Sequence, residues 1–193
     1  MTPLEFLAVV LPSLGHGLYC ACEMTDKKEH IFVEDTAEFY PKVDTWVENK
    51  CNVYFALATF DEKVAQIKGN KDRRTIVNSR FIKALFLDLD GYETKKAAAQ
   101  ALNQFMVKTG LDLLGTPWIV SSGGGLHCYW PLEETIEVAV WKPVPENFKR
   151  LCTQEKLRID NTVTADSARI LRIPETRSEE HTSELQSLRH LVC

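Results

Sequence analysis

The 193-residue chain lacks the sequence features that identify membrane, secreted and zinc-binding proteins. No apolar run approaches the length of a membrane span. Leu4 to Leu14 is interrupted by Glu5 and Pro12 and lacks the basic start of a signal peptide. The six cysteines include no C-x-x-C pair and no Cys/His cluster at zinc spacing, so we expect reduced, mostly structural thiols. A net charge of −4 argues against a coat of nucleic acid, although a local basic track is compatible with it. We expect a cytoplasmic globular protein.

The segment from Arg177 to Cys193 differs in character from the rest of the chain. Its first part, Arg177 to Ser187, resembles one reading frame of a common sequencing-library adapter. We therefore expect residues 177–193 to be an artefactual tail and the natural gene to continue beyond Thr176. Residues 1–176 are long enough for one domain with a hydrophobic core. Within it we expect an N-terminal αβ unit over about residues 1–60 and a core over about residues 61–176.

The most informative stretch is the apolar run Ala84 to Leu87 followed by Asp88-Leu89-Asp90-Gly91. An apolar run of this length that ends in a turn signal predicts a central strand buried on both faces. Because alternate side chains of a strand point to opposite faces, Asp88 and Asp90 project to the same side. Two neighbouring carboxylates repel each other, so a bridging divalent cation explains the pair better than the alternative, a solvated pair that caps the following turn.

Apolar spacing and turn signals predict helices and strands along the rest of the chain. Thr36 is the expected cap of the second helix, and His16 and His30 are expected in loops as solvated residues. Helices are expected over residues 2–11, 36–48, 95–108 and 146–157, and strands over residues 18–24, 31–33, 53–59, 117–122 and 126–131.

A glycine-rich turn joins the last two of these strands and ends close to His127. Consecutive glycines let backbone N–H groups approach a ligand and form an anion-binding concavity, and serine hydroxyls add donors. A hairpin turn needs glycines too, and a single histidine on a strand is often a packing residue, so both structural alternatives stay open. The candidate anion-binding residues of this turn are Ser121, Ser122, Gly123, Gly124, Gly125 and His127.

Two further groups of charged residues are candidates for function. A basic segment precedes the aspartate strand and is either a solvated loop or a track for phosphates; its candidate DNA-binding residues are Lys71, Arg73, Arg74 and Arg80. Near the end of the chain, Asp160 follows Ile159 at an expected strand end, and Arg169 and Arg172 lie among apolar residues. Simple surface salt bridging would explain the two arginines, and their apolar neighbours equally indicate partly desolvated guanidiniums that require anionic partners, so both explanations stay open.

Taken in order, these motifs resemble the archaeo-eukaryotic primase superfamily, in the small primase-polymerase form carried by phages, plasmids and bacterial mobile elements. The resemblance covers roughly Val53 to Thr176. Its motifs are Phe86-Leu87-Asp88-Leu89-Asp90, the Ser/Gly-rich turn from Ser121 to His127, Ile159-Asp160, and the arginine-containing stretch Ala168-Arg169-Ile170-Leu171-Arg172-Ile173-Pro174.

The resemblance implies an α+β fold in which a mixed sheet like that of an RNA-recognition motif lies beside a smaller N-terminal αβ unit. It also implies metal-dependent nucleotidyl transfer, with two Mg²⁺ or Mn²⁺ ions held by Asp88, Asp90 and Asp160. Asp160 is preferred to Asp166 as the third ligand, because Asp166 fits a turn cap. His127, the glycine amides, Arg169 and Arg172 would contact the phosphates.

The implied activity is that of a DNA primase-polymerase in mobile-element or phage replication. It would act on a single-stranded DNA template with NTPs or dNTPs. Whether a helicase domain followed in the intact gene stays open.

The chain departs from the family pattern at two positions. Relatives often carry a small polar residue where this chain has Gly125, so backbone amides or the serines would have to supply that phosphate contact. Glu175 stands inside a Pro-Gly-Thr pattern that many relatives have after the arginine strand.

Two other classes of protein remain as alternatives. A haloacid-dehalogenase-like phosphatase also begins with strand-Asp-x-Asp-Gly and would use Asp88 as its nucleophile, but that family has threonine where this chain has Tyr92. A non-catalytic replication initiator would account for the basic segment, although it gives no reason for three acids to converge.

Overall fold

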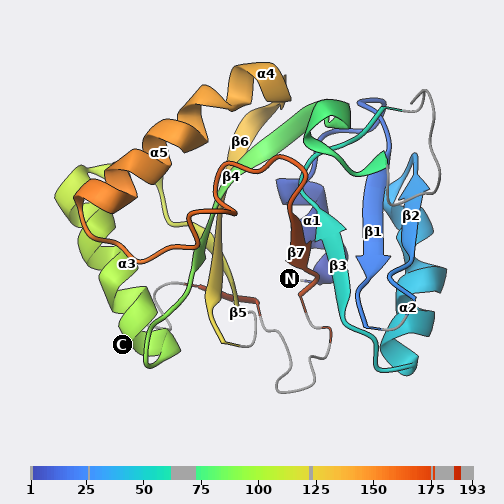
Figure 1. The fold of residues 1–193 in the computed structure, drawn as a ribbon, viewed down its shortest axis with the longest axis horizontal. Helices are drawn as coiled ribbons and strands as arrows, with labels where there is room; N and C mark the ends of the chain where they lie inside the picture. The colour runs from blue at the N-terminus through green and yellow to red at the C-terminus, as the bar shows by residue number, and fades with distance from the viewer. Residues whose placement is uncertain are drawn as a thin grey trace.

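The computed structural model describes residues 2–25, 27–61, 73–121, 124–174, 176 and 185–187. Two antiparallel sheets stand side by side, with strand orders β2-β1-β3-β7 and β4-β6-β5-β8 (Figure 1). Helices cover their outer sides, and α1 lies between the sheets (Figure 1). The α+β fold class is confirmed. In detail, all strand pairs within the described residues are antiparallel, so neither sheet is mixed.

The first sheet combines strands from both ends of the chain. Its register sets Tyr54 opposite both Cys22 and Arg172, so the late β7 completes a sheet built mainly by the first sixty residues. The proposed division near residue 60 therefore stays a prediction. The strands are β1 (Tyr19–Glu23), β2 (His30–Val33), β3 (Val53–Ala56) and β7 (Ile170–Arg172).

The N-terminal helices have well-defined caps. The helix α1 (Pro3–Val10) begins at a capping box in which Thr2 and Glu5 bond each other's backbone N–H groups. The 3-10 helix η1 (Thr36–Phe39) leads into α2 (Tyr40–Glu48). The expected cap at Thr36 is wrong by one residue, because the Asp35 carboxylate accepts the Ala37 N–H at 2.9 Å.

The second sheet carries the aspartate stretch on its first strand. It consists of β4 (Phe81–Leu89), β6 (Leu126–Glu137), β5 (Trp118–Ser121) and β8 (Leu185–Ser187). The short β8 pairs with β5 and comes from the segment that resembles a sequencing adapter. Three residues of that segment therefore contribute to the fold described here, while its origin stays a prediction.

The expectation that the aspartate strand is central is wrong. Strand β4 lies at one end of its sheet, and no other described strand pairs with its outer edge. Side chains and a loop cover that edge instead, since the Trp141 indole N–H donates to the Ala84 carbonyl at 3.0 Å and the Asp160 N–H donates to the Asp88 carbonyl at 2.8 Å. The long apolar run reflects the burial of both faces of β4, by helices on one side and by α1 and the first sheet on the other, without a second strand neighbour.

Helices and 3-10 turns cover one face of the second sheet. Thr94 caps α3 (Lys95–Thr109), and Gly110 ends it with a φ of +74° that other residues adopt reluctantly. The remaining elements are η3 (Ile76–Asn78), η4 (Leu111–Leu114), α4 (Val138–Trp141) and α5 (Pro143–Gln154). Among the described residues, no helix combines the length and apolar character needed to cross a lipid bilayer.

Alternation along the strands gives the second sheet two faces with different surroundings. On the face that we call the helix face, Leu87, Leu89 and Leu126 pack against α3 and α5. On the opposite face, which we call the cleft face, Phe86 and Tyr129 pack against α1 and the first sheet. The described cysteines are free thiols, as expected, and four of them are buried.

Candidate functional site

The strand register places Asp88 and His127 together on the cleft face. The two residues are direct partners in the β4–β6 pairing, and Val120 of β5 completes the row. Directly opposed residues of an antiparallel pair point to the same side of the sheet. His127 Nε2 and Asp88 Oδ2 are 3.6 Å apart, and these side chains are only 10% and 17% exposed. The predicted juxtaposition of His127 with the aspartates is therefore present.

The contact between His127 and Asp88 joins a neutral imidazole to a carboxyl group. Burial, followed by the charges of Arg172 and Arg169, lowers the pKa of His127 to about 3. At neutral pH the histidine carries no charge, and 3.6 Å is too long for a hydrogen bond. The buried Nδ1 atom has no hydrogen-bond partner among the described residues, so a ligand in the cleft would remove an unfavourable state.

Asp160 reaches this site through the open edge of β4. Its backbone N–H donates to the Asp88 carbonyl at 2.8 Å, which holds the two acid-bearing segments together. Its carboxylate Oδ1 accepts from the Thr162 hydroxyl at 2.6 Å and from the Thr162 N–H at 2.8 Å. These bonds, the hydroxyl contact first, lower the pKa of the partly exposed Asp160 carboxyl. The expected strand end at Ile159 and Asp160 is wrong, because both residues lie in a loop after α5, where the carboxylate is bonded to its own turn.

The three acids act on one another electrostatically. Burial, followed by the charges of Asp160 and Asp90, raises the pKa of Asp88 to about 6, against the lowering effect of Arg169. Asp90 is exposed, and its Oδ1 accepts the Gly91 N–H at 2.7 Å. A half-buried carboxylate with two like charges nearby is an unfavourable arrangement that a cation would relieve.

The chemistry of this group suits a hard divalent ion. Carboxylate oxygens are preferred ligands of Mg²⁺ and Mn²⁺, and the buried, repelled Asp88 provides the charge excess that such an ion neutralises. Within the described residues, however, no three His, Cys, Asp or Glu side chains are already arranged as a metal site. One carboxylate oxygen of Asp160, Oδ1, is bonded to its own turn. Asp88, Asp90 and Asp160 are the residues that could hold the metal.

Close approach of the backbone explains why Gly125 has no side chain. A Cβ atom there would lie 2.5 Å from the Leu89 carbonyl oxygen and 3.7 Å from Asp88 Oδ1. The glycine therefore lets the turn lie against the end of β4, next to the aspartates. Gly124 has open space around it, whereas Ser122 and Gly123 lie outside the described residues. The small polar side chain common in relatives does not fit at position 125 without a shift of this turn.

The structure does not bring the Ser121 hydroxyl to the cleft. Ser121 pairs with Leu126, which places its side chain on the helix face, opposite to that of His127. Its hydroxyl is 2% exposed and accepts a hydrogen bond from Lys95 Nζ at the start of α3. The sequence reasoning grouped Ser121 with the glycine turn and did not resolve which face its side chain takes, because that depends on the strand register.

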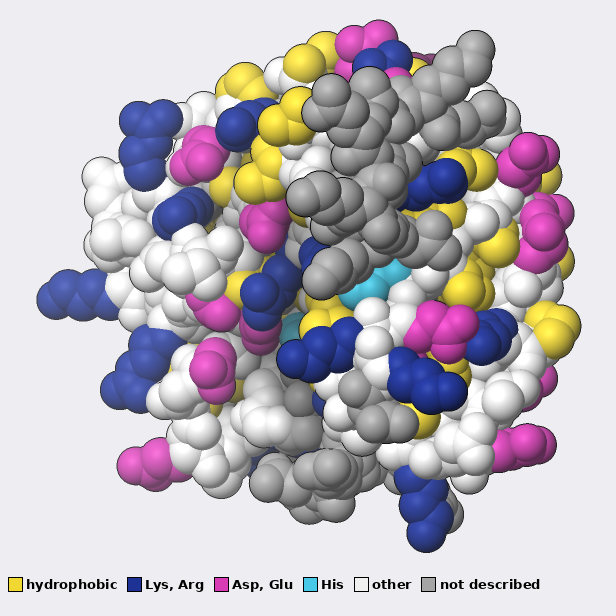
Figure 2. Space-filling model, turned by 45° about the vertical axis from the view of Figure 1, so that its right-hand side comes forward, with side chains coloured by type: hydrophobic (Ala, Val, Ile, Leu, Met, Phe, Trp, Pro, Cys, Tyr) yellow, Lys and Arg dark blue, Asp and Glu magenta, His cyan; other side chains and the backbone are white. Residues whose placement is uncertain are grey.

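Two arginines from the end of the chain lie near the acids and His127. The charge of Arg169 lowers the pKa of both Asp88 and Asp160, and its buried Nε has no partner among the described residues. The buried Arg172 donates to Asn52 Oδ1 at 3.0 Å and to the Tyr54 hydroxyl at 2.9 Å. On the face shown in Figure 2, lysine and arginine side chains surround acidic and histidine side chains near the centre.

The sequence reasoning missed the two residues that hold Arg172. Its guanidinium carbon lies 4.8 Å from the centre of the Tyr54 ring, so Tyr54 both stacks on the arginine and bonds it. Asn52 and Tyr54 are separated from Arg172 by 120 and 118 residues. No local pattern signals such a contact, since it depends on β7 pairing with β3.

Most of the predicted basic track is engaged within the protein. Arg74 donates from Nε to His30 Nε2 at 3.1 Å and from Nη1 to the Ala168 carbonyl at 2.6 Å. Arg73 lies over the Phe32 ring, and the exposed Arg80 is 3.8 Å from the Asp61 carboxylate. Lys71 lies outside the described residues.

His30 corrects another expectation. It lies in β2 and is 5% exposed, so it is not a solvated loop residue. In the sequence, a histidine beside a charged turn resembles a loop residue. Only the pairing of β2 with β1 shows that His30 is buried.

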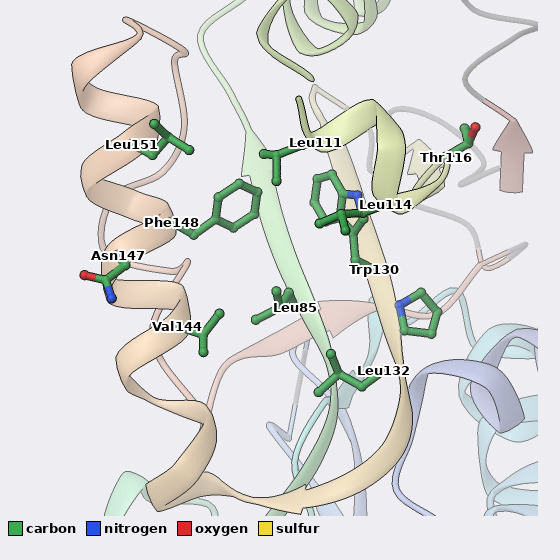
Figure 3. Close-up of a pocket in the computed structure, with 11 residues that line it drawn as sticks. Leu85, Leu111, Leu114, Thr116, Trp130, Leu132, Val144, Asn147, Phe148 and Leu151 are labelled. Carbon is green, nitrogen blue, oxygen red and sulfur yellow. The ribbon is translucent and has the colours of Figure 1, made fainter. Parts of the chain in front are cut away.

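An apolar pocket lies away from these groups. It has a volume of about 450 Å³ and opens between α5 and η4, with Leu85, Trp130 and Phe148 pointing into it (Figure 3). Leu85 and Trp130 are paired on the helix face, so this pocket is on the other side of the sheet from Asp88. Its lining offers no acid or histidine, and it takes no part in the candidate site.

Comparison with known proteins gives one sequence relative and several structural ones. No family model matches the chain. A replication protein of Clostridium perfringens is 29% identical over 126 residues, which are 64% of this chain and 28% of that protein. The chain therefore matches less than a third of the length of this relative.

Solved structures resemble the fold over nearly its whole length. The primase-polymerase AEP domain of cyanophage S-2L has a TM-score of 0.62 at 15% identity and covers 95% of this chain and 86% of its own. The polymerase domain of Mycobacterium tuberculosis ligase D, solved in complex with DNA, has a TM-score of 0.53 at 17% identity and covers 98% and 80%. The primase RepB′ has a TM-score of 0.53 at 9% identity and covers 96% and 56%. At these identities the likeness concerns the fold.

Proposed function

We propose that this chain is a DNA primase-polymerase catalytic domain of the archaeo-eukaryotic type, acting in the replication of a phage or mobile element. It would join nucleotides on a single-stranded DNA template by a two-metal mechanism. The observation that carries the proposal is the bond between the Asp160 N–H and the Asp88 carbonyl, which brings the third acid to the other two. The primase-polymerase fold of the solved structures and the replication protein among the relatives support the same class of reaction.

Asp88, Asp90 and Asp160 would hold two Mg²⁺ or Mn²⁺ ions. When bound, the ions would lower the pKa of the attacking 3′-hydroxyl and neutralise charge on the triphosphate and the departing pyrophosphate. To contribute ligands, Asp160 would exchange its bonds to Thr162 for contact with the metal. Because the pKa of Asp88 is raised to about 6, its carboxyl would hold a cation better at mildly alkaline pH than at acidic pH.

Neighbouring groups would bind the phosphates. Phosphoryl transfer needs mainly positioning and neutralisation of charge, which Arg169 and Arg172 provide from the side of β7. Arg172 is already oriented by Asn52 and Tyr54, so its guanidinium loses little freedom on binding. The neutral His127 would offer a ring nitrogen to a phosphate oxygen or water.

The test is nucleotide incorporation by purified protein. The protein is incubated with single-stranded template, Mn²⁺ and labelled nucleotides, with and without a primer, and Asp88→Ala is compared with wild type. Loss of a central metal ligand should lower incorporation by at least about a hundredfold. Asp112→Ala is the matched control, because Asp112 is an exposed acid in η4, outside the candidate site.

Three other outcomes would point elsewhere. No labelled product from wild type under any nucleotide mixture would count against polymerisation. A trapped phospho-aspartate at Asp88 would indicate the phosphatase alternative. Unchanged activity and DNA binding in Asp88→Ala and Asp90→Ala would favour a non-catalytic replication initiator.

A further inference from the structure

The two segments that carry Asp90 and Asp160 also carry a tyrosine and an arginine that contact each other. The Arg158 N–H donates to the Tyr92 hydroxyl at 3.0 Å, and Arg158 Nη1 donates to the Gly91 carbonyl at 2.6 Å. The guanidinium carbon lies 5.7 Å from the centre of the Tyr92 ring. An exposed guanidinium is therefore fixed beside Asp90, against an aromatic ring.

Helix α5 adds a second cation on the same side. Lys149, on α5, lies within electrostatic reach of the Asp160 side chain. We call Tyr92, Lys149 and Arg158 the Arg158 rim. Among the ion pairs that the described residues form within 4.0 Å, none includes Lys149 or Arg158.

The arginines of the basic segment that precedes β4 are less available to a ligand than the cations of the Arg158 rim. Arg74 is bonded to His30 and Ala168, and Arg73 lies over Phe32. Arg80 precedes β4, and the eight residues from it to Asp88 span about 26 Å at about 3.3 Å per residue. Of the described cations of this segment, Arg73 and Arg74 are engaged inside the protein and Arg80 is distant from the acids, whereas the cations of the Arg158 rim adjoin Asp90 and Asp160.

We propose that the Arg158 rim binds single-stranded DNA next to the acidic cleft, with Lys149 and Arg158 on backbone phosphates and Tyr92 stacked on a base. The inference rests on the proposed polymerase function and names the surface that guides the template or primer strand. A strand that reaches a cluster of carboxylates needs cations along its path, because its phosphates are repelled by the acids. An aromatic ring beside an arginine is a typical stacking surface for an unpaired base, and the partly buried Tyr92 ring lies at the margin of the helix-face core.

The experiment measures DNA binding directly. Fluorescence anisotropy of a fluorescein-labelled oligodeoxythymidine is recorded without nucleotides or metal, over a series of salt concentrations. The double variant Lys149→Ala/Arg158→Ala should weaken binding about tenfold or more at low salt. Loss of two phosphate contacts should also reduce the slope of log Kd against log salt by about 1.4, at about 0.7 per contact on single strands. Tyr92→Leu should weaken binding without changing this slope, because it removes a stacking surface but no charge.

The matched control is Lys27→Ala/Lys50→Ala, which removes the same charge from exposed positions in the turn between β1 and β2 and after α2. We expect it to change the Kd less than about twofold at equal net charge. Lys149→Glu alone keeps every contact of Arg158 and tests the rim in a variant that should fold normally. An equal effect of rim and control variants, an unchanged Kd in the rim variants, or no DNA binding by wild type would each overturn the proposal.

Primer extension separates this proposal from the proposed function. If the wild-type protein extends a primer and the rim variants extend it equally well, the proposed DNA-binding role of the Arg158 rim is wrong and the polymerase function stands. If DNA binding depends on the Arg158 rim but the wild-type protein extends no primer, the polymerase function is wrong and the DNA-binding role of the rim stands.

Discussion

The two faces of the second sheet are built by alternating residues of the same strands, yet they have opposite physical characters. On the helix face, Leu87 and Leu89 are fully buried and pack with α3. On the cleft face, Asp88 sits between them in sequence with a carboxyl whose ionisation is opposed by burial and by like charges. Burial of leucine stabilises the fold, whereas burial of Asp88 destabilises it in the absence of a cation. Adjacent residues of one strand therefore have different roles: the leucines stabilise the fold, and Asp88 belongs to the candidate site.

The largest effect on this comparison should come from the helix face. Leu87→Ala removes a fully buried side chain and should lower the free energy of unfolding by about 2–5 kcal/mol. Denaturant unfolding measures the loss. Leu113→Ala, at a position 87% exposed, is the control and should change stability by no more than about 0.5 kcal/mol. A small loss for Leu87→Ala would mean that the helix face is not the stabilising one.

On the cleft face, substitution of Asp88 should raise the free energy of unfolding instead of lowering it. The folded-state pKa of Asp88 is about 6, above the ordinary 3.8, so its ionisation opposes folding above about pH 6, and this penalty fades as the pH falls toward 4. Asp88→Asn should therefore stabilise the metal-free protein at pH 8 by on the order of 3 kcal/mol, and by much less near pH 4.

Thermal melts in the presence of a chelator, across this pH range, test the sign. The control Asp112→Asn should give a difference that stays small at every pH. A destabilised Asp88→Asn at pH 8 would show that the carboxylate is compensated by groups of the protein itself.

A smaller effect is expected where the two faces meet at the turn. Gly125→Ala places a Cβ atom 2.5 Å from the Leu89 carbonyl and should cost about 1–3 kcal/mol of stability as the turn shifts. Gly124→Ala, which has open space, is the matched control and should be nearly neutral. If both variants were equally stable, the close approach at Gly125 would not constrain the turn.

The smallest effect should come from Ser121→Ala. Its hydroxyl bonds Lys95 on the helix face, so the variant should lose about 1 kcal/mol or less of stability and leave the KM for nucleotides within about twofold. Steady-state incorporation assays measure the KM. A large rise in KM would contradict the assignment of this side chain to the helix face and return Ser121 to the phosphate contacts.

Local patterns predicted most of the secondary structure. The periodicity and caps of α1 and α3 are written in consecutive residues, such as Thr2 with Glu5 and Thr94 with Gly110. The alternation of Asp88, Leu89 and Asp90 likewise needs only strand geometry. Contacts between distant segments were missed for the opposite reason. Neither the Arg74–His30 bond nor the Tyr54–Arg172 stack has a local signal, and the edge position of β4 depends on which strands pair.

By itself the sequence determined which side chains carry the candidate chemistry, because residue type and strand alternation are local properties of Asp88, Asp90, His127 and Asp160. Only the tertiary structure decided how they meet. The open edge of β4 accepts the Asp160 N–H, and the register of β4, β6 and β5 puts His127 on the cleft face and Ser121 on the other. Register and edge position arise from the packing of the whole chain, which no single segment encodes.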